Sequence, residues 1–175
     1  MGRKTYSIEV NKTHVCGEDY CEEGEAGGEC EKSGTPVFHC IHIASYNPII
    51  WQDALSDPSE IVIEDDEITI IFDYPLKCEF PLNFRSAGGF SRRSLIEKIV
   101  NTYKTIYETE ENTTTLPIET QAERAKRLGS GRCHLVNRAN TDGTYGIWGH
   151  GLSDLFIEEI TYIPKDCVVR LGIGS

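Results

Sequence analysis

The chain of 175 residues has a hydrophobic fraction of 39% and a charged fraction of 26%, which is the composition of an ordinary globular domain. Its net charge of −11 argues against a general nucleic-acid-binding protein, because binding to phosphate groups needs a basic surface. No apolar run approaches the roughly 18 residues that a membrane span requires, which argues against a membrane protein.

The first third of the chain predicts short strands on either side of an acidic loop. Residues 4–10 (KTYSIEV) alternate in the manner of a strand, and residues 37–44 (VFHCIHIA) predict a second one. Between them, residues 14–35 are rich in Cys, Gly and Glu and lack apolar periodicity, so this segment has no core of its own. Residues 49–55 predict a short helical turn around Trp51.

Two further strands are predicted at residues 61–63 (IVI) and 68–72 (ITIIF). The intervening residues 64–67 (EDDE) read as an acidic hairpin connection between them. Residues 80–84 are apolar but contain Pro81, which cannot donate a hydrogen bond inside a sheet. We therefore expect an extended segment at a sheet edge.

A long amphipathic helix is the clearest predicted element. Ser91 follows two glycines and is a suitable N-cap. The apolar residues after it recur at helical spacing through about five turns, forming one broad face that a sheet could cover. These residues are Leu95, Ile96, Ile99, Val100, Tyr103, Ile106 and Tyr107.

The remaining predicted elements complete an α+β domain. Pro117 fits the start of a second, polar surface helix at residues 118–128, and residues 133–136 form a short strand at most. Residues 155–163 and 167–173 predict a closing hairpin. The order of strands, helices and strands favours a single α+β domain over residues 1–175, with a mainly antiparallel sheet packed on the long helix.

The first candidate site is residues 141–155 (TDGTYGIWGHGLSDL), which we call the glycine-aromatic loop. It has neither helical nor strand periodicity, and its glycines suit positions of unusual backbone conformation. Tyr145 and Trp148 could anchor it or bind a ligand, because each ring combines a large apolar body with a polar edge. His150 could act as a general base oriented by Asp154, although a His ring bonded to the loop backbone is the simpler interpretation.

Basic side chains provide a second candidate site. Arg92 and Arg93, with Arg85 nearby, fall at the start of the long helix, where free N–H groups and the helix dipole attract anions. Arg138 could join them in clamping an anionic substrate. The Gly-Lys-Ser/Thr ending of a phosphate-binding loop is missing, so ordinary solvated arginines remain the alternative.

The seven cysteines are an odd number, and no secretory signal precedes them, so we expect an intracellular protein with reduced thiols. Cys16, Cys21, Cys30 and Cys40 could hold a structural zinc ion, because a metal would order a loop without a core. The spacing matches no standard zinc finger, so incidental thiols in an acidic loop are the alternative, with no cofactor at all.

Two stretches together resemble a known family. One is the helix start at residues 89–95 (GFSRRSL), continued through Ile99, Tyr103, Ile106, Tyr107 and Glu110. The other is Asn137 and Arg138, then residues 141–150 (TDGTYGIWGH), with Asp154 and Leu155 following. This pairing resembles an uncharacterised family of large DNA viruses and some eukaryotes, over about residues 80–175. The resemblance implies a viral protein of the infected cell or the virion, without a known activity. The family usually has Asp after the His, where this chain has Gly151, which weakens a His-Asp catalytic pair.

Three functions remain open from the sequence. The first is a non-enzymatic intracellular interaction or structural protein that binds a protein partner or forms a homodimer through the glycine-aromatic loop. The second is a hydrolase or transferase acting on an anionic small molecule with His150 as base. The third is a zinc-stapled binding module centred on the cysteine-rich loop.

Overall fold

The computed structural model describes residues 5–8, 13–14, 37–38, 41–49, 55–119, 121–128 and 138–175. The short strand predicted at residues 133–136 lies outside this part of the chain, as does most of the helical turn predicted at residues 49–55. All four candidate zinc-ligating cysteines also lie outside it.

Within the described residues, the largest unit is a six-stranded mixed sheet. Its strands are β1 (Tyr6–Ser7), β4 (Ile41–His42), β6 (Glu67–Phe72), β7 (Phe80–Arg85), β9 (Phe156–Ile163) and β10 (Val168–Gly174). They run in the order β1-β9-β10-β6-β7, with β4 also paired to β9. All pairs are antiparallel except β6 with β10, which confirms an α+β domain with a mainly antiparallel sheet.

The closing hairpin predicted from the sequence is confirmed. Strands β9 and β10 pair antiparallel from Val168 opposite Ile163 to Gly174 opposite Phe156. The register shifts between Gly172 and Ile173, where a bulge interrupts the ladder. Ser175, which follows β10, lies beside the glycine-aromatic loop, with its hydroxyl 3.5 Å from the His150 Nε2 atom.

The hairpin predicted at residues 61–72 is wrong. Strand β5 (Ile61–Ile63) pairs with β8 (Phe90–Ser91) in a separate two-stranded sheet, whereas β6 pairs with β7 and β10. Gly89 makes this pairing possible, because it has φ +87° and a Cβ there would lie 2.4 Å from the Ile63 carbonyl oxygen. The acidic connection therefore links two sheets.

The predicted strand at residues 37–44 contributes to two sheets. Residues 37–38 form β3 (Val37–Phe38), which pairs with β2 (Thr13–His14), and residues 41–42 form β4, which joins the main sheet. The two described parts of the predicted strand therefore have different partners. Sequence alternation alone does not show such a change of partner.

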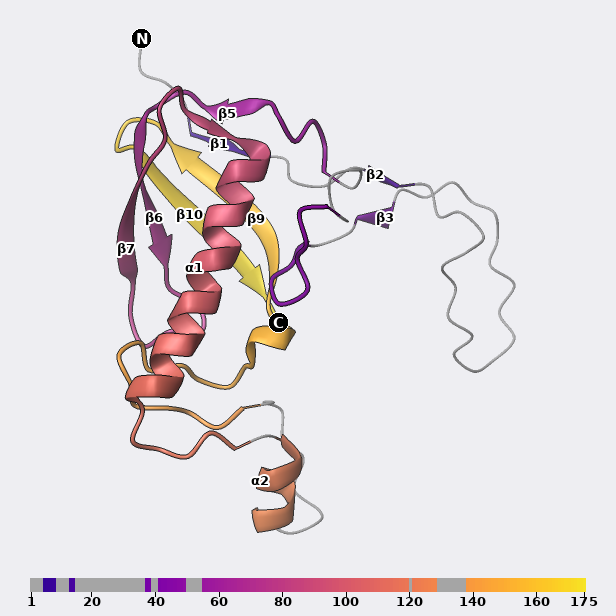
Figure 1. Cartoon of the computed structure of the whole chain (residues 1–175), viewed down its shortest axis with the longest axis vertical. Coiled ribbons are helices and arrows are strands. Elements are labelled where there is room, and N and C mark those ends of the chain that lie inside the picture. The colour runs from indigo at the N-terminus through magenta and orange to yellow at the C-terminus, as the bar shows by residue number, and fades with distance from the viewer. Residues whose placement is uncertain are drawn as a thin grey trace, which may run out of the picture.

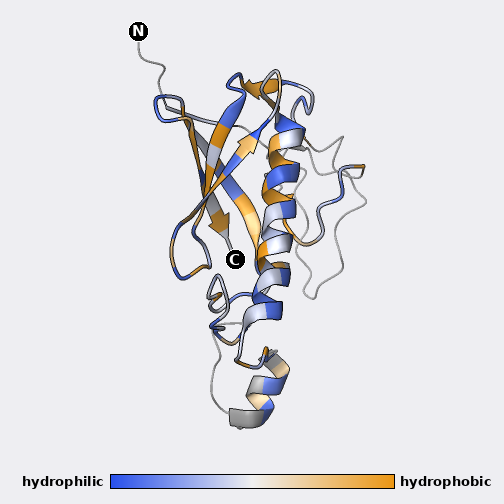
Figure 2. Cartoon of the chain, turned by 60° about the vertical axis from the view of Figure 1, so that its left-hand side comes forward, coloured by the Kyte–Doolittle hydropathy of each residue, from blue (hydrophilic) through white to orange (hydrophobic). Residues whose placement is uncertain are grey.

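Helix α1 (Arg92–Thr113) is 22 residues long and lies across one face of the sheet (Figure 1). Its N-cap is Ser91, as predicted, and the Ser91 hydroxyl accepts a hydrogen bond from the Ser94 N–H at 3.2 Å. All seven apolar residues predicted for its inner face are buried. Tyr103 is among the largest buried side chains and packs edge-on against Phe72 of β6, with ring centroids 5.3 Å apart. Figure 2 shows hydrophobic residues in both the helix and the strands beside it.

The second helix begins later than predicted. Helix α2 (Gln121–Leu128) lies away from the sheet in Figure 1, in keeping with its expected surface position. In the described ranges, no helix has both the length and the apolar character needed to cross a membrane. The predicted edge segment is β7, the last strand of the sheet, where the ring of Pro81 is tolerated.

Candidate recognition site

The glycine-aromatic loop is fastened to α1 by a buried carboxylate. Glu110 is fully buried near the end of the helix. One of its oxygens accepts the N–H of Gly143 at 2.8 Å, and the other accepts the N–H groups of Tyr145 at 2.8 Å and Gly146 at 3.1 Å. One side chain thus satisfies three amides of a segment that has no regular structure.

The environment of Glu110 favours its charged form. Burial raises the pKa of this carboxyl, but hydrogen bonds from the Thr141 hydroxyl and the three loop amides lower it to below its ordinary value. The fit is close, because a Cβ on Gly143 would lie 2.7 Å from the Glu110 carboxyl carbon. Glycine is therefore required at this position of the loop.

A second carboxylate fastens the start of the loop to the end of α1. Asp142 accepts hydrogen bonds from the hydroxyl and the N–H of Thr115, and from the Thr114 hydroxyl at 2.8 Å. These bonds, the one from the Thr115 side chain above all, lower the pKa of Asp142. The adjoining Thr113 hydroxyl accepts the Thr144 N–H at 3.0 Å. Five consecutive loop residues, 142–146, are thus bonded to the last turn of the helix or the residues after it.

The other side of the loop lies against the segment that follows β6. The Trp148 N–H donates to the Pro75 carbonyl at 3.0 Å, and the Lys77 N–H donates to the Tyr145 carbonyl at 3.0 Å. Ile147, between these two bonds, is completely buried. The loop is consequently held from two sides and has an apolar centre of its own.

Against this fixed backbone, Trp148 presents its ring to solvent. Its side chain is 41% exposed, and its ring lies edge-on to that of Tyr74, with centroids 5.3 Å apart. The His150 ring lies 5.8 Å from Trp148 and 5.7 Å from Tyr74. We call these three residues the aromatic face. The Tyr74 hydroxyl lies 2.7 Å from the hydroxyl of Ser175, which fixes the edge of this face.

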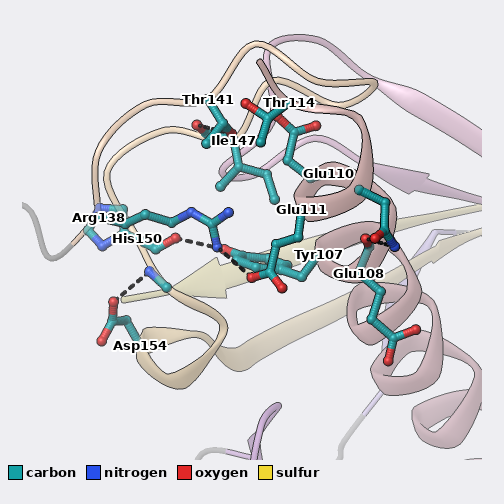
Figure 3. A network of polar contacts seen from close by, with 12 residues as sticks. Tyr107, Glu108, Glu110, Glu111, Thr114, Arg138, Thr141, Ile147, His150 and Asp154 are labelled. Atoms are coloured by element: carbon teal, nitrogen blue, oxygen red, sulfur yellow. Dashed lines mark hydrogen bonds and ion pairs between the residues drawn. The ribbon is translucent and has the colours of Figure 1, made fainter. Parts of the chain in front are cut away.

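The two residues predicted as a catalytic pair have separate contacts. The Asp154 carboxylate accepts the Gly151 N–H at 2.7 Å and closes the short 3-10 helix η1 (Leu152–Asp154). The ring of His150 has its Nε2 atom 3.5 Å from the Ser175 hydroxyl, and within the described part of the chain its buried Nδ1 atom has no hydrogen-bond partner. In Figure 3 the Asp154 carboxylate is bonded to the backbone beyond His150.

The Arg138 side chain packs against Tyr107, close to the His150 end of the glycine-aromatic loop. Its side chain is 7% exposed, its guanidinium carbon lies 5.1 Å from the centroid of the Tyr107 ring, and a terminal nitrogen is 3.5 Å from Glu111 (Figure 3). The Tyr107 hydroxyl donates to the His150 carbonyl at 2.9 Å. Tyr107 therefore contacts both Arg138 and the loop. The Nε and Nη2 atoms of Arg138 are buried and have no hydrogen-bond partner among the described residues.

Arg92 and Arg93 lie at the opposite end of α1. Tyr107 is fifteen residues after Arg92 in the helix, a distance of about 22 Å at 1.5 Å per residue. The structure therefore brings Arg138 close to His150 but leaves the two helix-start arginines too far away to share one small ligand with them.

The start of α1 also has its N–H groups occupied. The Arg92 N–H donates to the Glu60 carbonyl at 2.9 Å, the Arg93 N–H donates to the Pro58 carbonyl at 3.0 Å, and the Ser94 N–H donates to the Ser91 hydroxyl. The buried Arg92 side chain forms an ion pair with Glu60. An anion at this end of the helix would have to rely on guanidinium groups alone.

The predicted zinc ligands cannot be placed, because all four cysteines lie outside the described residues. Within the described residues, no three His, Cys, Asp or Glu side chains are grouped in a way that could hold a metal ion. The zinc site stays a prediction from the sequence.

The sequence interpretation gave no role in the site to three residues of this region, namely Glu110, Tyr74 and Ser175. One of them carried a readable signal. Glu110 continues the spacing of Tyr103 and Ile106 on the buried face of α1, so a charged residue stands where an apolar one is expected. A charge in such a position needs a partner, and the neighbouring loop provides it.

Comparison of the chain with known protein families, with curated proteins and with solved structures finds no match in any of the three.

Proposed function

We propose that this protein is a non-enzymatic interaction protein and that the aromatic face is its contact surface for another protein. The observation that carries the proposal is the exposed ring of Trp148 on a loop whose backbone is bonded from two sides. Tryptophan is the residue type most enriched among the side chains that dominate binding energy at protein interfaces. Its neighbours Tyr74 and His150 combine apolar ring surface with polar atoms, which suits a partly hydrated interface.

The fixed loop supports this role energetically. Binding usually requires loops and side chains to become ordered, at a cost of about 0.5–1.5 kcal/mol for each immobilised side chain. Here Glu110 and Asp142 have already ordered the backbone that carries Trp148. The loop would consequently bind without first losing conformational freedom of its own.

The partner is a protein chain with an apolar pocket for the indole ring, or a second copy of this chain. From the resemblance to a family of large DNA viruses, we also propose that the protein acts in an infected cell or in the virus particle. An intracellular location belongs to the same proposal.

Substitution of Trp148 tests the proposal. We expect proteins enriched from cells by the tagged wild-type chain to be lost with Trp148→Ala and retained with Leu116→Ala. Leu116 is a matched control, because it is 45% exposed and lies outside the aromatic face. Sedimentation velocity of the same three proteins reports self-association. Identical enriched proteins and identical sedimentation for all three would refute the proposal.

A second candidate is a hydrolase or transferase acting on an anionic small molecule. It is supported by the contacts of the Arg138 side chain and the His150 carbonyl with the same tyrosine, Tyr107. Both side chains also have buried nitrogen atoms for which the described residues provide no hydrogen-bond partner. In this proposal His150 is the base and Arg138 holds the anion. Inorganic phosphate should then raise the melting temperature of the wild-type protein and leave that of Arg138→Gln unchanged.

The zinc-stapled module remains the third proposal, with Cys16, Cys21, Cys30 and Cys40 as ligands. Native mass spectrometry of protein purified in reducing buffer without added metal tests it directly. One zinc ion per chain, lost on Cys16→Ser, is the expected result. A metal-free chain would exclude this role.

A further inference from the structure

A groove of about 300 Å³ lies between the edge strand β7 and helix α1, away from the aromatic face. Its floor is apolar and is formed by Leu82 and Phe84 of β7, Ile106 of α1 and Tyr145 of the glycine-aromatic loop. We call it the edge groove. An apolar channel between a strand and a helix is the shape in which several protein domains hold an extended peptide.

The outer side of β7 has backbone groups available for pairing. The N–H of Ser86, directly after β7, donates to the carbonyl of Asp66, directly before β6, so this N–H points toward β6 and the interior of the sheet. Because backbone groups alternate along a strand, the N–H groups of Leu82 and Phe84 also point inward to β6, and those of Asn83 and Arg85 point outward. Within the described part of the chain, no strand pairs with this outer edge.

Pro81 falls on the outward side of the same alternation. Proline has no backbone N–H, so no donor is left unpaired at this position. The groups available to a partner strand are therefore the N–H groups of Asn83 and Arg85 and the carbonyl groups that point outward. The proline also disfavours a second copy of β7 as the partner. An antiparallel copy centred on Asn83 would set Pro81 opposite Arg85 in both halves and lose a hydrogen bond in each. The edge is better suited to a peptide of different sequence.

A positive charge at one end of the groove indicates which side chain the peptide should carry there. The Lys98 ammonium lies 5.8 Å from the centroid of the Phe84 ring, at the end of the groove where β7 finishes. Among the described residues no carboxylate is paired with it, in contrast to the nearby Arg85, which is bonded to Glu67 at 3.1 Å. The net charge of −11 disfavours a strongly acidic ligand. A single acidic residue beside Lys98 fits both observations.

We propose that the edge groove binds an extended peptide segment of a partner protein, which adds a strand antiparallel to β7. Its acidic residue lies beside Lys98, and the apolar side chains that follow, at every second position, lie on Leu82, Ile106 and Tyr145. Backbone hydrogen bonds to β7 supply general affinity, and the groove floor with Lys98 supplies selectivity. The proposal goes beyond the role of the aromatic face and does not depend on it.

Two substitutions block the groove without touching the buried core. Thr105 is exposed on α1 and lines the groove, so Thr105→Arg would fill the space above the floor. Asn83→Pro removes an outward N–H group of the edge and leaves every N–H that faces β6 in place. Thermal unfolding shows that each variant is folded before binding is measured.

A phage-displayed library of random dodecapeptides is the probe. Selection on the wild-type protein should enrich peptides with an acidic residue followed by alternating apolar residues. Their affinity should fall by about tenfold or more in Thr105→Arg and in Asn83→Pro, and be unchanged in Trp148→Ala, which separates this site from the aromatic face. Selection on Lys98→Glu should enrich a basic residue at the position of the acidic one.

Amide hydrogen exchange locates the bound peptide. In the unbound protein the amides of Asn83 and Arg85 should exchange faster than those of Leu82 and Phe84, and a selected peptide should protect them. The proposal is overturned by a selection without enrichment, by peptides that bind wild type and Thr105→Arg equally, or by an unchanged charge preference in Lys98→Glu. If the wild-type chain forms a dimer and Thr105→Arg dissociates it, the groove binds a second copy of this chain, and the peptide proposal is overturned.

Discussion

Replacing Glu110 with glutamine should destabilise the domain, because the side chain would then have one acceptor oxygen in place of two. The carboxylate accepts the Gly143 N–H on one oxygen and the N–H groups of Tyr145 and Gly146 on the other. A glutamine oxygen can keep the pair of amides, but its NH₂ group then faces the N–H of Gly143. A buried donor without an acceptor costs about 1–3 kcal/mol, and the two retained bonds lose their charge. We expect Glu110→Gln to lower the free energy of unfolding by about 3 kcal/mol at pH 7.

The destabilisation should depend on pH in a definite direction. Hydrogen bonds hold the pKa of Glu110 below its ordinary value of 4.5 in the folded protein. The ionised carboxylate therefore contributes stability above pH 4.5, and this contribution is lost as the pH falls toward the folded pKa. Glutamine does not titrate. The difference between wild type and Glu110→Gln should narrow as the pH falls below 4.5, by at most about 1.4 kcal/mol per pH unit, the limit for a single proton.

Urea denaturation of both proteins at pH 7 and at pH 3.5 measures this difference. Glu108→Gln is the matched control, since Glu108 lies two residues away on the same helix with an exposed side chain. It should change the stability by no more than about 0.5 kcal/mol at either pH. A loss below 1 kcal/mol for Glu110→Gln, or a difference from wild type that stays constant with pH, would refute the structural role of Glu110.

Two smaller predictions test other contacts. Gly89→Ala should cost about 3 kcal/mol or more, since a Cβ there would lie 2.4 Å from the Ile63 carbonyl oxygen. Gly88→Ala is its control and should cost about 1–2 kcal/mol, because Gly88 shares the positive φ, +81°, but among the described residues only its chain neighbours lie within 4 Å of the added Cβ. Equal thermal shifts for the two variants would contradict the close approach. Tyr107→Phe removes the hydrogen bond to the His150 carbonyl and should cost about 1 kcal/mol in urea denaturation. An unchanged midpoint would show that this bond does not hold the loop.

Local patterns were sufficient for the elements whose partners are close in the chain. The apolar spacing after Ser91 predicts the long helix and its buried face, and the structure confirms both. The β9–β10 hairpin is equally local, because only a short turn separates its strands. The proline in β7 correctly predicted an edge position, since Pro81 cannot donate to a neighbouring strand.

The candidate site was predicted only in outline. The composition of residues 141–155 indicated an ordered loop with an aromatic anchor, and the structure places Trp148 on its surface and Ile147 in its centre. The composition of this loop did not indicate that Glu110, more than thirty residues earlier in the chain, accepts hydrogen bonds from the loop amides. That contact depends on where the end of the long helix lies relative to the loop.

The sequence by itself determined the long helix, the closing hairpin and the α+β class, because each follows from the periodicity of neighbouring residues. Only the tertiary structure decided the parallel pairing of β6 with β10, the pairing of β5 with β8 and the attachment of the loop to Glu110. These contacts join segments far apart in the chain. Their geometry depends on how the helix and the sheet pack together, and the pattern of residues in a short segment does not determine that packing.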